Sequence, residues 1–204
     1  MTQPASRRWG DDRALLDDDE ARRLLLEAAA RCITRRGNAQ IRMAEVADEA
    51  GVVRSTVYRY FATRDDLLLG LLLRRTDVAM AEFVRGLAEP GDAATSIPEL
   101  ILGPISRVDG NPLNEALFAT ESTSVTAAVQ AGAEPVVDVL MRHYGPLLED
   151  WQAGGQLRSD LDLRATAHWL NSVSHFLLAP PWRQRPLAAK RQFVEQYVLR
   201  ALLA

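Results

Sequence analysis

The chain has 204 residues, of which 48% are hydrophobic and 25% are charged, and its formal net charge at neutral pH is -3. A chain of this length and composition can bury a substantial core and has room for one small module and one larger one. It begins with no charged-then-apolar leader and contains no apolar run of about 18 residues. These absences exclude a secretory signal and a membrane-spanning helix, and they predict a soluble, cytoplasmic protein without a membrane partner.

The composition favours helices throughout the chain. Aromatic residues make up only 6% of it, alanine, leucine and arginine are abundant, and no segment alternates polar and apolar residues over the length of a strand. We therefore expect an all-α protein without a sheet.

Residues 1–17 are polar and irregular, and we expect a flexible N-terminal arm. Arg7 and Arg8 are suited to a DNA minor groove, but phosphate would repel the aspartates that follow them. An arm without a function of its own is the favoured interpretation. The aspartates suit the start of the first helix, where negative charge is stabilised by the helix dipole.

The segment LLEAAARCITRRG has the apolar period of a helix and ends at Gly37. Cys32 is the only cysteine of the sequence, and it falls on the apolar face of this helix with Leu25, Ala28 and Ala29. We expect a buried structural thiol rather than a redox sensor, and a single cysteine excludes an internal disulfide.

Residues 43–67, MAEVADEAGVVRSTVYRYFATRDDL, have the spacing of two short helices joined by a glycine turn, with a third helix beginning after them. Ala47 is small where the second helix must cross closely, and Gly51 accepts the positive φ that a tight turn needs. Val57 packs the second helix back against the first. The apolar positions repeat every three and four residues, so one face of each helix belongs to the core: Met43, Val46, Ala47 and Ala50 on the first, Val57, Tyr60 and Phe61 on the second. This is the layout of a helix-turn-helix that reads DNA.

The second helix of the pair leaves a polar face for DNA. Hydroxyl donors and guanidinium groups suit phosphate oxygens and the acceptor edges of purines. Thr63 and Asp66 predict a capping box for the next helix, with Arg64 beside backbone amides that attract phosphate. A helical hairpin with a solvated basic face is the alternative. The residues expected to contact DNA are Arg42, Arg54, Ser55, Thr56, Tyr58, Arg59, Tyr60 and Arg64.

These motifs resemble the DNA-binding domain of the TetR (tetracycline-repressor-like) family. The run STVYRYFATRDDLL, from Ser55 to Leu68, is similar to the family's recognition helix and the start of its next helix. The resemblance implies a three-helix helix-turn-helix DNA-binding domain at residues 18–66. It also implies a larger helical effector-binding and dimerisation domain at residues 67–204.

Several positions differ from the family pattern. Ile41 and Arg42 replace a Thr or Ser pair that caps the first reading helix, and Val53 replaces a serine cap. Ala62 replaces a frequent proline and Asn38 a frequent aromatic residue. Each cap contributes about 1 kcal/mol, so the fold tolerates the changes. We expect Arg42 to substitute a charge for the lost hydroxyl contact with phosphate.

Charge is unevenly distributed along the chain. Between Arg31 and Arg64 there are seven arginines and three carboxylates, a net charge of +4 in a chain whose total is -3. This asymmetry predicts a positive reading head on an acidic body, which orients the head towards DNA.

An apolar helix is expected from about residue 64 to 88, connecting the head with the rest of the chain. Turn-forming segments then separate five further stretches with helical period. Together with the four helices in front, they make about nine helices. The expected ranges are 93–108, 112–128, 133–153, 162–179 and 186–203.

The resemblance to the TetR family implies a homodimer, in which the last two helices pair with their copies as a four-helix interface. Both helices carry apolar stripes that allow this, although such stripes can also face their own core. A dimer sets two recognition helices about 34 to 36 Å apart, or a multiple of that distance, and so predicts a palindromic operator. The interface candidates are Ala165, Trp169, Ser172, Val173, Phe176, Phe193 and Tyr197.

The resemblance also implies a cavity for a small molecule among the central helices. The candidate lining residues are mostly apolar, so the ligand should be mostly hydrophobic, although each of them also suits an ordinary core. The three histidines, His143, His168 and His175, do not have metal-ligand spacing, and we expect neither a metal nor another cofactor. The ligand-binding candidates are Phe83, Ile101, Ile105, Phe118, Met141, Tyr144, Leu147 and Trp151.

These features together predict a ligand-responsive transcriptional repressor that binds double-stranded DNA as a dimer and is released by a small hydrophobic effector. A constitutive or activating DNA-binding regulator without an effector is the alternative. An all-helical enzyme is disfavoured, because the sequence has no glycine-rich phosphate loop, no paired carboxylates with histidine partners and no nucleophile with a plausible base.

Overall fold

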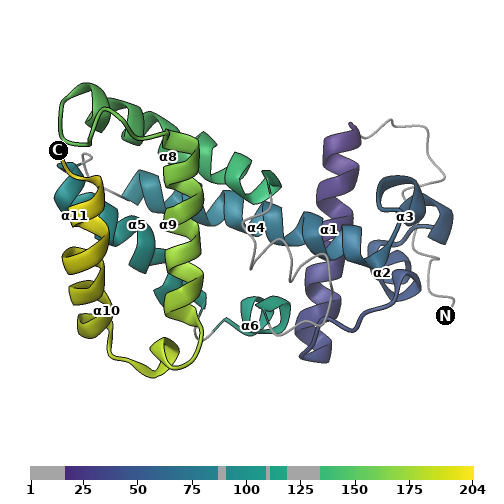
Figure 1. The fold of residues 1–204 in the computed structure, drawn as a ribbon. Coiled ribbons are helices and arrows are strands. Elements are labelled where there is room, and N and C mark those ends of the chain that lie inside the picture. The colour runs from purple at the N-terminus through teal and green to yellow at the C-terminus, as the bar shows by residue number, and fades with distance from the viewer. Residues whose placement is uncertain (1–16, 87–90, 109–110, 119–133) are drawn as a thin grey trace, which may run out of the picture. The chain divides into compact units, whose positions relative to one another are not determined.

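The computed structural model describes residues 17–86, 91–108, 111–118 and 134–204, with the backbone alone for residues 106–108 and 118. The described residues are helical and contain no strand, which confirms the predicted all-α class (Figure 1). No described helix is long and apolar enough to cross a membrane. The N-terminal arm expected at residues 1–17 lies outside the described residues except for Asp17.

The described residues group into two compact units. Unit 1 extends to Leu72 and includes the described residues 111–118, whereas unit 2 holds residues 73–86, 91–108 and 134–204. Unit 1 contains α1 (Asp18–Arg36), α2 (Met43–Ala50), α3 (Arg54–Tyr60), the first part of α4 (Arg64–Gly86) and α6 (Pro112–Phe118). The helix predicted at residues 112–128 is described only as far as Phe118.

Unit 1 has a small core in which α1 packs against α2. Leu25, Ala28, Ala29, Cys32 and Ile33 of α1 are buried, as expected for Cys32. Burial is the largest cause of the raised pKa of the Cys32 thiol, which fits a structural thiol rather than a reactive one. The helix ends at Gly37, whose φ of 74° is left-handed.

Unit 2 contains the rest of α4 and six further helical segments. α9 packs on α8 and on α5, and the C-terminal helices pack on α5 (Figure 1). The segments are α5 (Ala93–Val108), α8 (Glu134–Ala153), α9 (Leu163–Leu178), α10 (Leu187–Phe193), η2 (Val194–Val198) and α11 (Leu199–Leu202), with the 3₁₀ turn η1 (Trp182–Gln184) before α10.

One glycine and two prolines shape α5. A side chain at Gly103 would place its Cβ 2.2 Å from a ring carbon of Phe83 on α4, so glycine allows these helices to approach closely. Pro98 and Pro104 lie inside the helix, where each removes one backbone hydrogen bond. The carbonyl of Leu100, which Pro104 leaves without its helical donor, accepts a hydrogen bond from Tyr144.

The C-terminal helix differs from the regular helix expected at residues 186–203. A π-helical segment, Val194–Val198, separates α10 from α11. Val194 and Val198 remain buried across it, since side chains four residues apart lie on the same face of a helix. If α10, η2 and α11 count as one helix, the described residues contain nine helices besides η1, in agreement with the prediction.

Candidate nucleic-acid interface

The turn between α2 and α3 has the geometry that its spacing predicts. Gly51 has a φ of 70°, and the N–H of Val52 donates to the carbonyl of Ala47 at 2.9 Å. Ala47 and Val57 are 1% and 0% exposed, so the small residue lies at the crossing and the valine packs α3 against it. The spacing of Ala47, Gly51 and Val57 therefore suffices to determine how α3 packs against α2.

α3 turns its polar side outward. Arg54, Ser55, Tyr58 and Arg59 are exposed, and Thr56 and Tyr60 are half-buried. The helix has only seven residues, and Val53 at its N-cap offers no side-chain acceptor. α3 therefore depends on packing through Val57 rather than on its own cap for its position.

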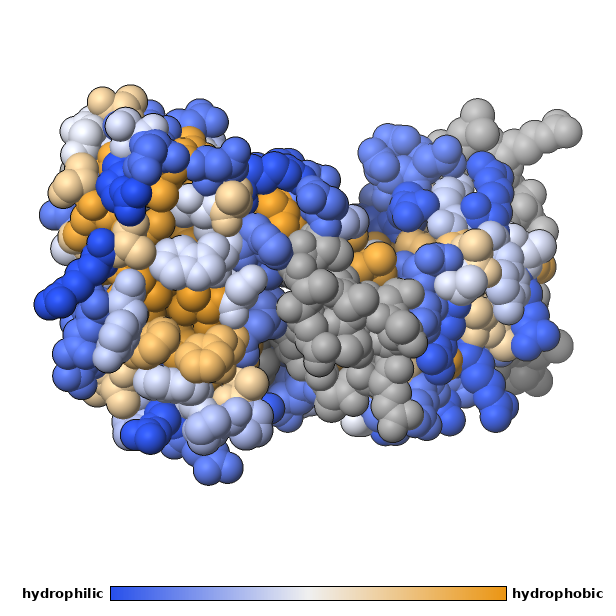
Figure 2. All heavy atoms as spheres, viewed as in Figure 1, coloured by the Kyte–Doolittle hydropathy of each residue, from blue (hydrophilic) through white to orange (hydrophobic). Residues whose placement is uncertain are grey.

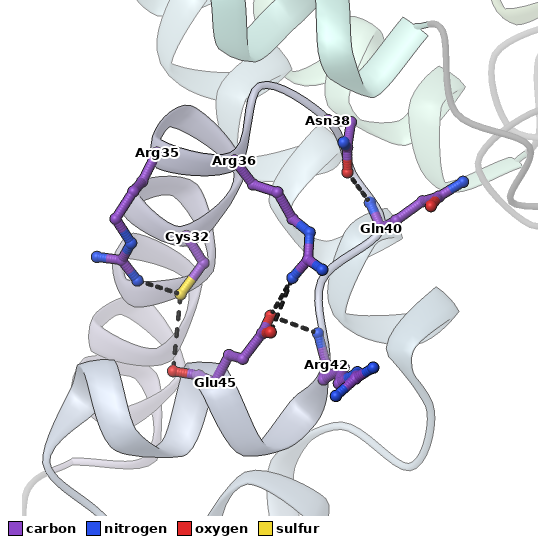
Figure 3. Close-up of polar contacts among 7 residues, drawn as sticks. All are labelled: Cys32, Arg35, Arg36, Asn38, Gln40, Arg42 and Glu45. Carbon is purple, nitrogen blue, oxygen red and sulfur yellow. Dashed lines mark hydrogen bonds and ion pairs between the residues drawn. The ribbon is translucent and has the colours of Figure 1, made fainter.

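The start of α2 is capped by Glu45, a residue of the helix itself. This cap compensates for the Thr or Ser pair that is replaced by Ile41 and Arg42. Ile41 is buried, and the N–H of Arg42 donates to Glu45 at 3.1 Å. Glu45 also accepts from Arg36 at 2.7 Å, and the hydrogen bonds from Arg42 and Arg36 lower its pKa. Figure 3 shows the guanidinium of Arg42 directed away from Glu45, and the side chain of Arg42 is exposed.

Three of the seven arginines in the head serve the packing of α1 on α2. Glu49 accepts from Arg31 at 2.7 Å and from Arg35 at 2.8 Å, and Arg36 pairs with Glu45. The guanidinium groups that remain towards the solvent side of α2, α3 and α4 come from Arg42, Arg54, Arg59 and Arg64. Fewer guanidinium groups are therefore available for DNA than the sequence count suggests, and they lie on and around α3.

The start of α4 has the predicted capping box. The N–H of Thr63 donates to the Asp66 carboxylate at 2.9 Å, and the N–H of Asp66 donates to the Thr63 hydroxyl at 3.0 Å. Arg64 is exposed but lies 3.4 Å from Asp65. A phosphate at this helix start would therefore compete with Asp65 for Arg64.

The first turns of α1 hold the end of α3, which the sequence analysis did not anticipate. Arg22 donates to the carbonyl of Tyr60 at 3.0 Å, and its guanidinium lies 4.6 Å from the ring centre of Phe61. Asp18 accepts from the Tyr60 hydroxyl at 2.9 Å and from Arg59 at 3.4 Å. These partners are 38 to 42 residues apart in sequence, so helical periodicity carried no signal for them.

The ligand candidates of unit 2 belong mostly to its core. Ile101, Ile105, Tyr144, Leu147 and Trp151 are buried. Phe83 and Met141 are half-buried, whereas Phe118 belongs to unit 1 and its side chain lies outside the described residues. Two polar groups of α9 were not predicted. The Ser174 hydroxyl lies 3.1 Å from the carbonyl oxygen of Leu170 and 3.4 Å from that of Ile101 on α5, and the Asn171 amide nitrogen is buried without a hydrogen-bond partner among the described residues.

The dimer candidates divide into an exposed group and a buried one. Trp169, Phe176 and Tyr197 are 39%, 48% and 64% exposed, whereas Val173 is buried in the core of unit 2. Val173 therefore departs from the expected stripe because the apolar period of α9 also serves the packing of that helix on α5 and α8. Ala165 is exposed, and Ser172 and Phe193 are half-buried.

An aromatic cluster joins two of the exposed candidates, Phe176 and Tyr197, through Trp182 and Phe193. The ring centres of Phe176 and Trp182 are 5.8 Å apart, those of Trp182 and Phe193 are 4.8 Å apart, and those of Phe193 and Tyr197 are 5.1 Å apart. Figure 2 shows hydrophobic atoms gathered over α9 and the C-terminal helices. Trp182 was not predicted to belong to this surface, because it lies in a proline-rich turn without an apolar period.

Comparison with known proteins agrees with this geometry. Residues 25–71 match the family described as bacterial regulatory proteins, tetR family. A helix-turn-helix-type transcriptional regulator of Mycobacterium tuberculosis is 32% identical over 86% of this chain and 82% of its own length.

Solved structures share the fold at low identity. The transcriptional repressor QsdR of R. erythropolis, from the TetR family, has a TM-score of 0.68 at 18% identity and covers 91% of this chain and 97% of its own. The regulator FadR of Bacillus subtilis in complex with stearoyl-CoA has a TM-score of 0.56 at 17% identity, covering 88% of this chain and 98% of its own.

Proposed function

The chain belongs to the TetR family of bacterial regulatory proteins, and on this premise we propose that it is a repressor that binds a palindromic operator as a homodimer and leaves it on binding a hydrophobic effector. It is a DNA-binding transcriptional regulator rather than an enzyme. The observation that carries the proposal is the outward polar face of α3, with Arg54, Ser55, Tyr58 and Arg59 exposed on a helix that is fixed through Val57.

The side chains of this face have different tasks in the proposal. Arg59 has the planar donor fork that recognises a purine edge, with guanine as its commonest partner. Arg54, Ser55, Thr56 and Tyr58 supply donors for phosphate oxygens. Arg42 and Arg64, at the starts of α2 and α4, add contacts with phosphates of the DNA backbone. These contacts fix the position of the head along the duplex.

A homodimer is supported by the apolar face of unit 2. Large aromatic side chains that remain exposed on one chain, as Trp169, Phe176 and Tyr197 do, are typical of a surface that another protein covers. A two-fold symmetric dimer presents two α3 helices, and its operator then has the same symmetry.

A hydrophobic effector is supported by the apolar character of the candidate lining residues in unit 2. The structural neighbour FadR is described in complex with stearoyl-CoA, a ligand with a long apolar chain. An effector that couples to the DNA-binding head by about 1 to 3 kcal/mol lowers operator affinity about 5- to 150-fold.

Selection of bound sequences from random duplex DNA tests the proposal. A recovered inverted repeat supports specific DNA recognition, the two-fold symmetry and the half-site spacing together. Recovery of no preferred sequence contradicts operator recognition, and recovery of a single half-site contradicts the dimer.

A constitutive or activating regulator remains the alternative. Melting of the protein in the presence of lipophilic compounds separates the two functions, because a ligand that binds only the folded state raises the melting temperature. A compound that raises it and also releases the selected operator supports effector-controlled repression. Compounds that stabilise the protein without changing operator affinity favour the alternative.

A further inference from the structure

Side chains of α1 contact the end of the recognition helix α3. Asp18, in the first turn of α1, accepts from both the Tyr60 hydroxyl at 2.9 Å and the Arg59 guanidinium at 3.4 Å. Arg22, one turn further on, donates to the Tyr60 carbonyl at 3.0 Å. The last two residues of α3 are therefore fixed by two side chains of α1.

Arg59 keeps most of its hydrogen-bonding capacity within these contacts. Its guanidinium carbon lies 5.2 Å from the ring centre of Tyr60, and its side chain is 70% exposed. Of the five N–H donors of a guanidinium, the contact with Asp18 uses one. The other donors remain available for a base edge or a phosphate.

The Asp18 carboxylate affects these two kinds of DNA contact differently. A carboxylate beside Arg59 repels phosphate, which carries a full negative charge, and it offsets the attraction between Arg59 and the DNA backbone. The N7 and O6 acceptors of guanine are uncharged, so they lose less of their attraction to Arg59. A guanidinium already held in one orientation also loses less conformational freedom when it binds a base.

Resting on the proposed DNA-binding function, we propose that Asp18 is a positioning residue that directs Arg59 towards a base edge and away from the phosphate backbone, and so raises the discrimination between operator and unrelated DNA. Asp18 belongs to the acidic start of α1, yet its contacts reach α3. The ligand chemistry that it selects is a neutral pair of acceptors on a purine, with phosphate oxygens disfavoured.

The proposal predicts opposite changes on two DNA molecules. In Asp18→Asn, operator affinity falls about two- to fivefold because a neutral amide oxygen holds Arg59 more weakly than a carboxylate does, and affinity for unrelated duplex DNA rises about two- to fivefold because the repelling charge is gone. The dependence of the unrelated complex on salt also steepens, by about 0.9 per head in the logarithmic plot, as Arg59 neutralises a phosphate.

The experiment measures fluorescence anisotropy with the operator selected from random DNA and with an unrelated duplex of equal length, over a salt series. Asp19→Asn is the matched control, since Asp19 is exposed in the same turn of α1 and its removal changes the formal charge by the same amount. Asp18→Glu keeps the carboxylate and is expected to stay near wild-type discrimination. Asp18→Ser is a second neutral variant, and melting by circular dichroism verifies that each variant folds.

Each outcome separates the inference from the proposed function. A discrimination ratio that falls in Asp18→Asn and Asp18→Ser but not in Asp19→Asn supports it. If Asp18→Asn shifts both complexes by the same factor, as Asp19→Asn is expected to do, Asp18 acts only as a surface charge and the inference is overturned. A wild-type protein that prefers no DNA sequence instead refutes the proposed function, whatever the variants do.

Discussion

The hydroxyl of Tyr144 on α8 lies 3.4 Å from the carbonyl oxygen of Leu100 on α5. Within a regular helix that carbonyl accepts from the N–H four residues later, but the residue there is Pro104, which has none. The same hydroxyl lies 2.6 Å from the sulfur of Met80 on α4. One buried hydroxyl thus links three helices of unit 2 at the point where a proline interrupts one of them.

Tyr144→Phe is expected to lower the free energy of unfolding by about 1 kcal/mol, because the Leu100 carbonyl and the Met80 sulfur both lose the buried hydroxyl beside them. Urea denaturation measures the change. Pro104→Ala restores a backbone donor for that carbonyl, so the loss caused by Tyr144→Phe should shrink in its presence. An equal loss in both backgrounds would show that the two positions are independent.

Glu49→Gln is expected to lower the melting temperature near neutral pH, because Glu49 joins α2 to Arg31 and Arg35 of α1. Hydrogen bonds from Arg35 and then Arg31 lower the pKa of Glu49 below its ordinary value of 4.5. Its contribution to stability is therefore present above pH 4.5 and is lost as the pH falls through the lowered pKa. The difference between wild type and Glu49→Gln should accordingly vanish in acid. Asp48→Asn, an exposed change on the same helix, should leave the pH profile unaltered.

Arg59→Ala is expected to weaken operator binding by about 1 to 3 kcal/mol if Arg59 reads a base, whereas Tyr58→Phe removes one phosphate contact and has a smaller effect. Fluorescence anisotropy at fixed salt measures both. Arg35→Ala is the matched control, because Arg35 pairs with Glu49 on the packing side of α2 and should change stability more than affinity. Unchanged affinity in Arg59→Ala would remove Arg59 from the set of DNA contacts.

Phe176→Asp is expected to convert the proposed dimer to monomers, since it places a charge in the exposed aromatic cluster that the proposed interface would bury. Sedimentation velocity over a concentration series measures the change. Val78 has nearly the same exposure, 46% against 48% for Phe176, but lies on α4 outside the cluster. Val78→Asp should therefore leave the oligomeric state unchanged. Dissociation in both variants would indicate a general loss of fold. Dissociation in neither variant would indicate that the dimer forms through a different interface.

Short-range features of the head were predictable from the sequence. Gly51 adopts the left-handed conformation expected of it, the first helix ends at Gly37 as predicted, and Thr63 and Asp66 form the expected capping box. In each, the interacting groups lie within about one helical turn, so spacing and residue type decide the geometry. The buried positions of Cys32 and Val57 follow from the same helical period.

The partners of these helices were less predictable. The seven arginines of the head were expected to form one positive set, yet Arg31, Arg35 and Arg36 form ion pairs with carboxylates of α2. Trp182 joined the aromatic cluster from a turn without any period. A charged or aromatic side chain on a helix surface suits solvent, a neighbouring helix or a partner equally well, and periodicity alone does not distinguish them.

For this protein, the spacing of small residues, turn glycines and apolar residues along the chain was enough to predict the helices, the turns and the outward side of α3. These features depend on interactions between residues only a few positions apart. Which carboxylate meets which guanidinium, and which hydroxyl reaches the carbonyl freed by Pro104, depended on packing. Asp18 and Tyr60 are 42 residues apart in sequence, and the fold alone brings them to 2.9 Å.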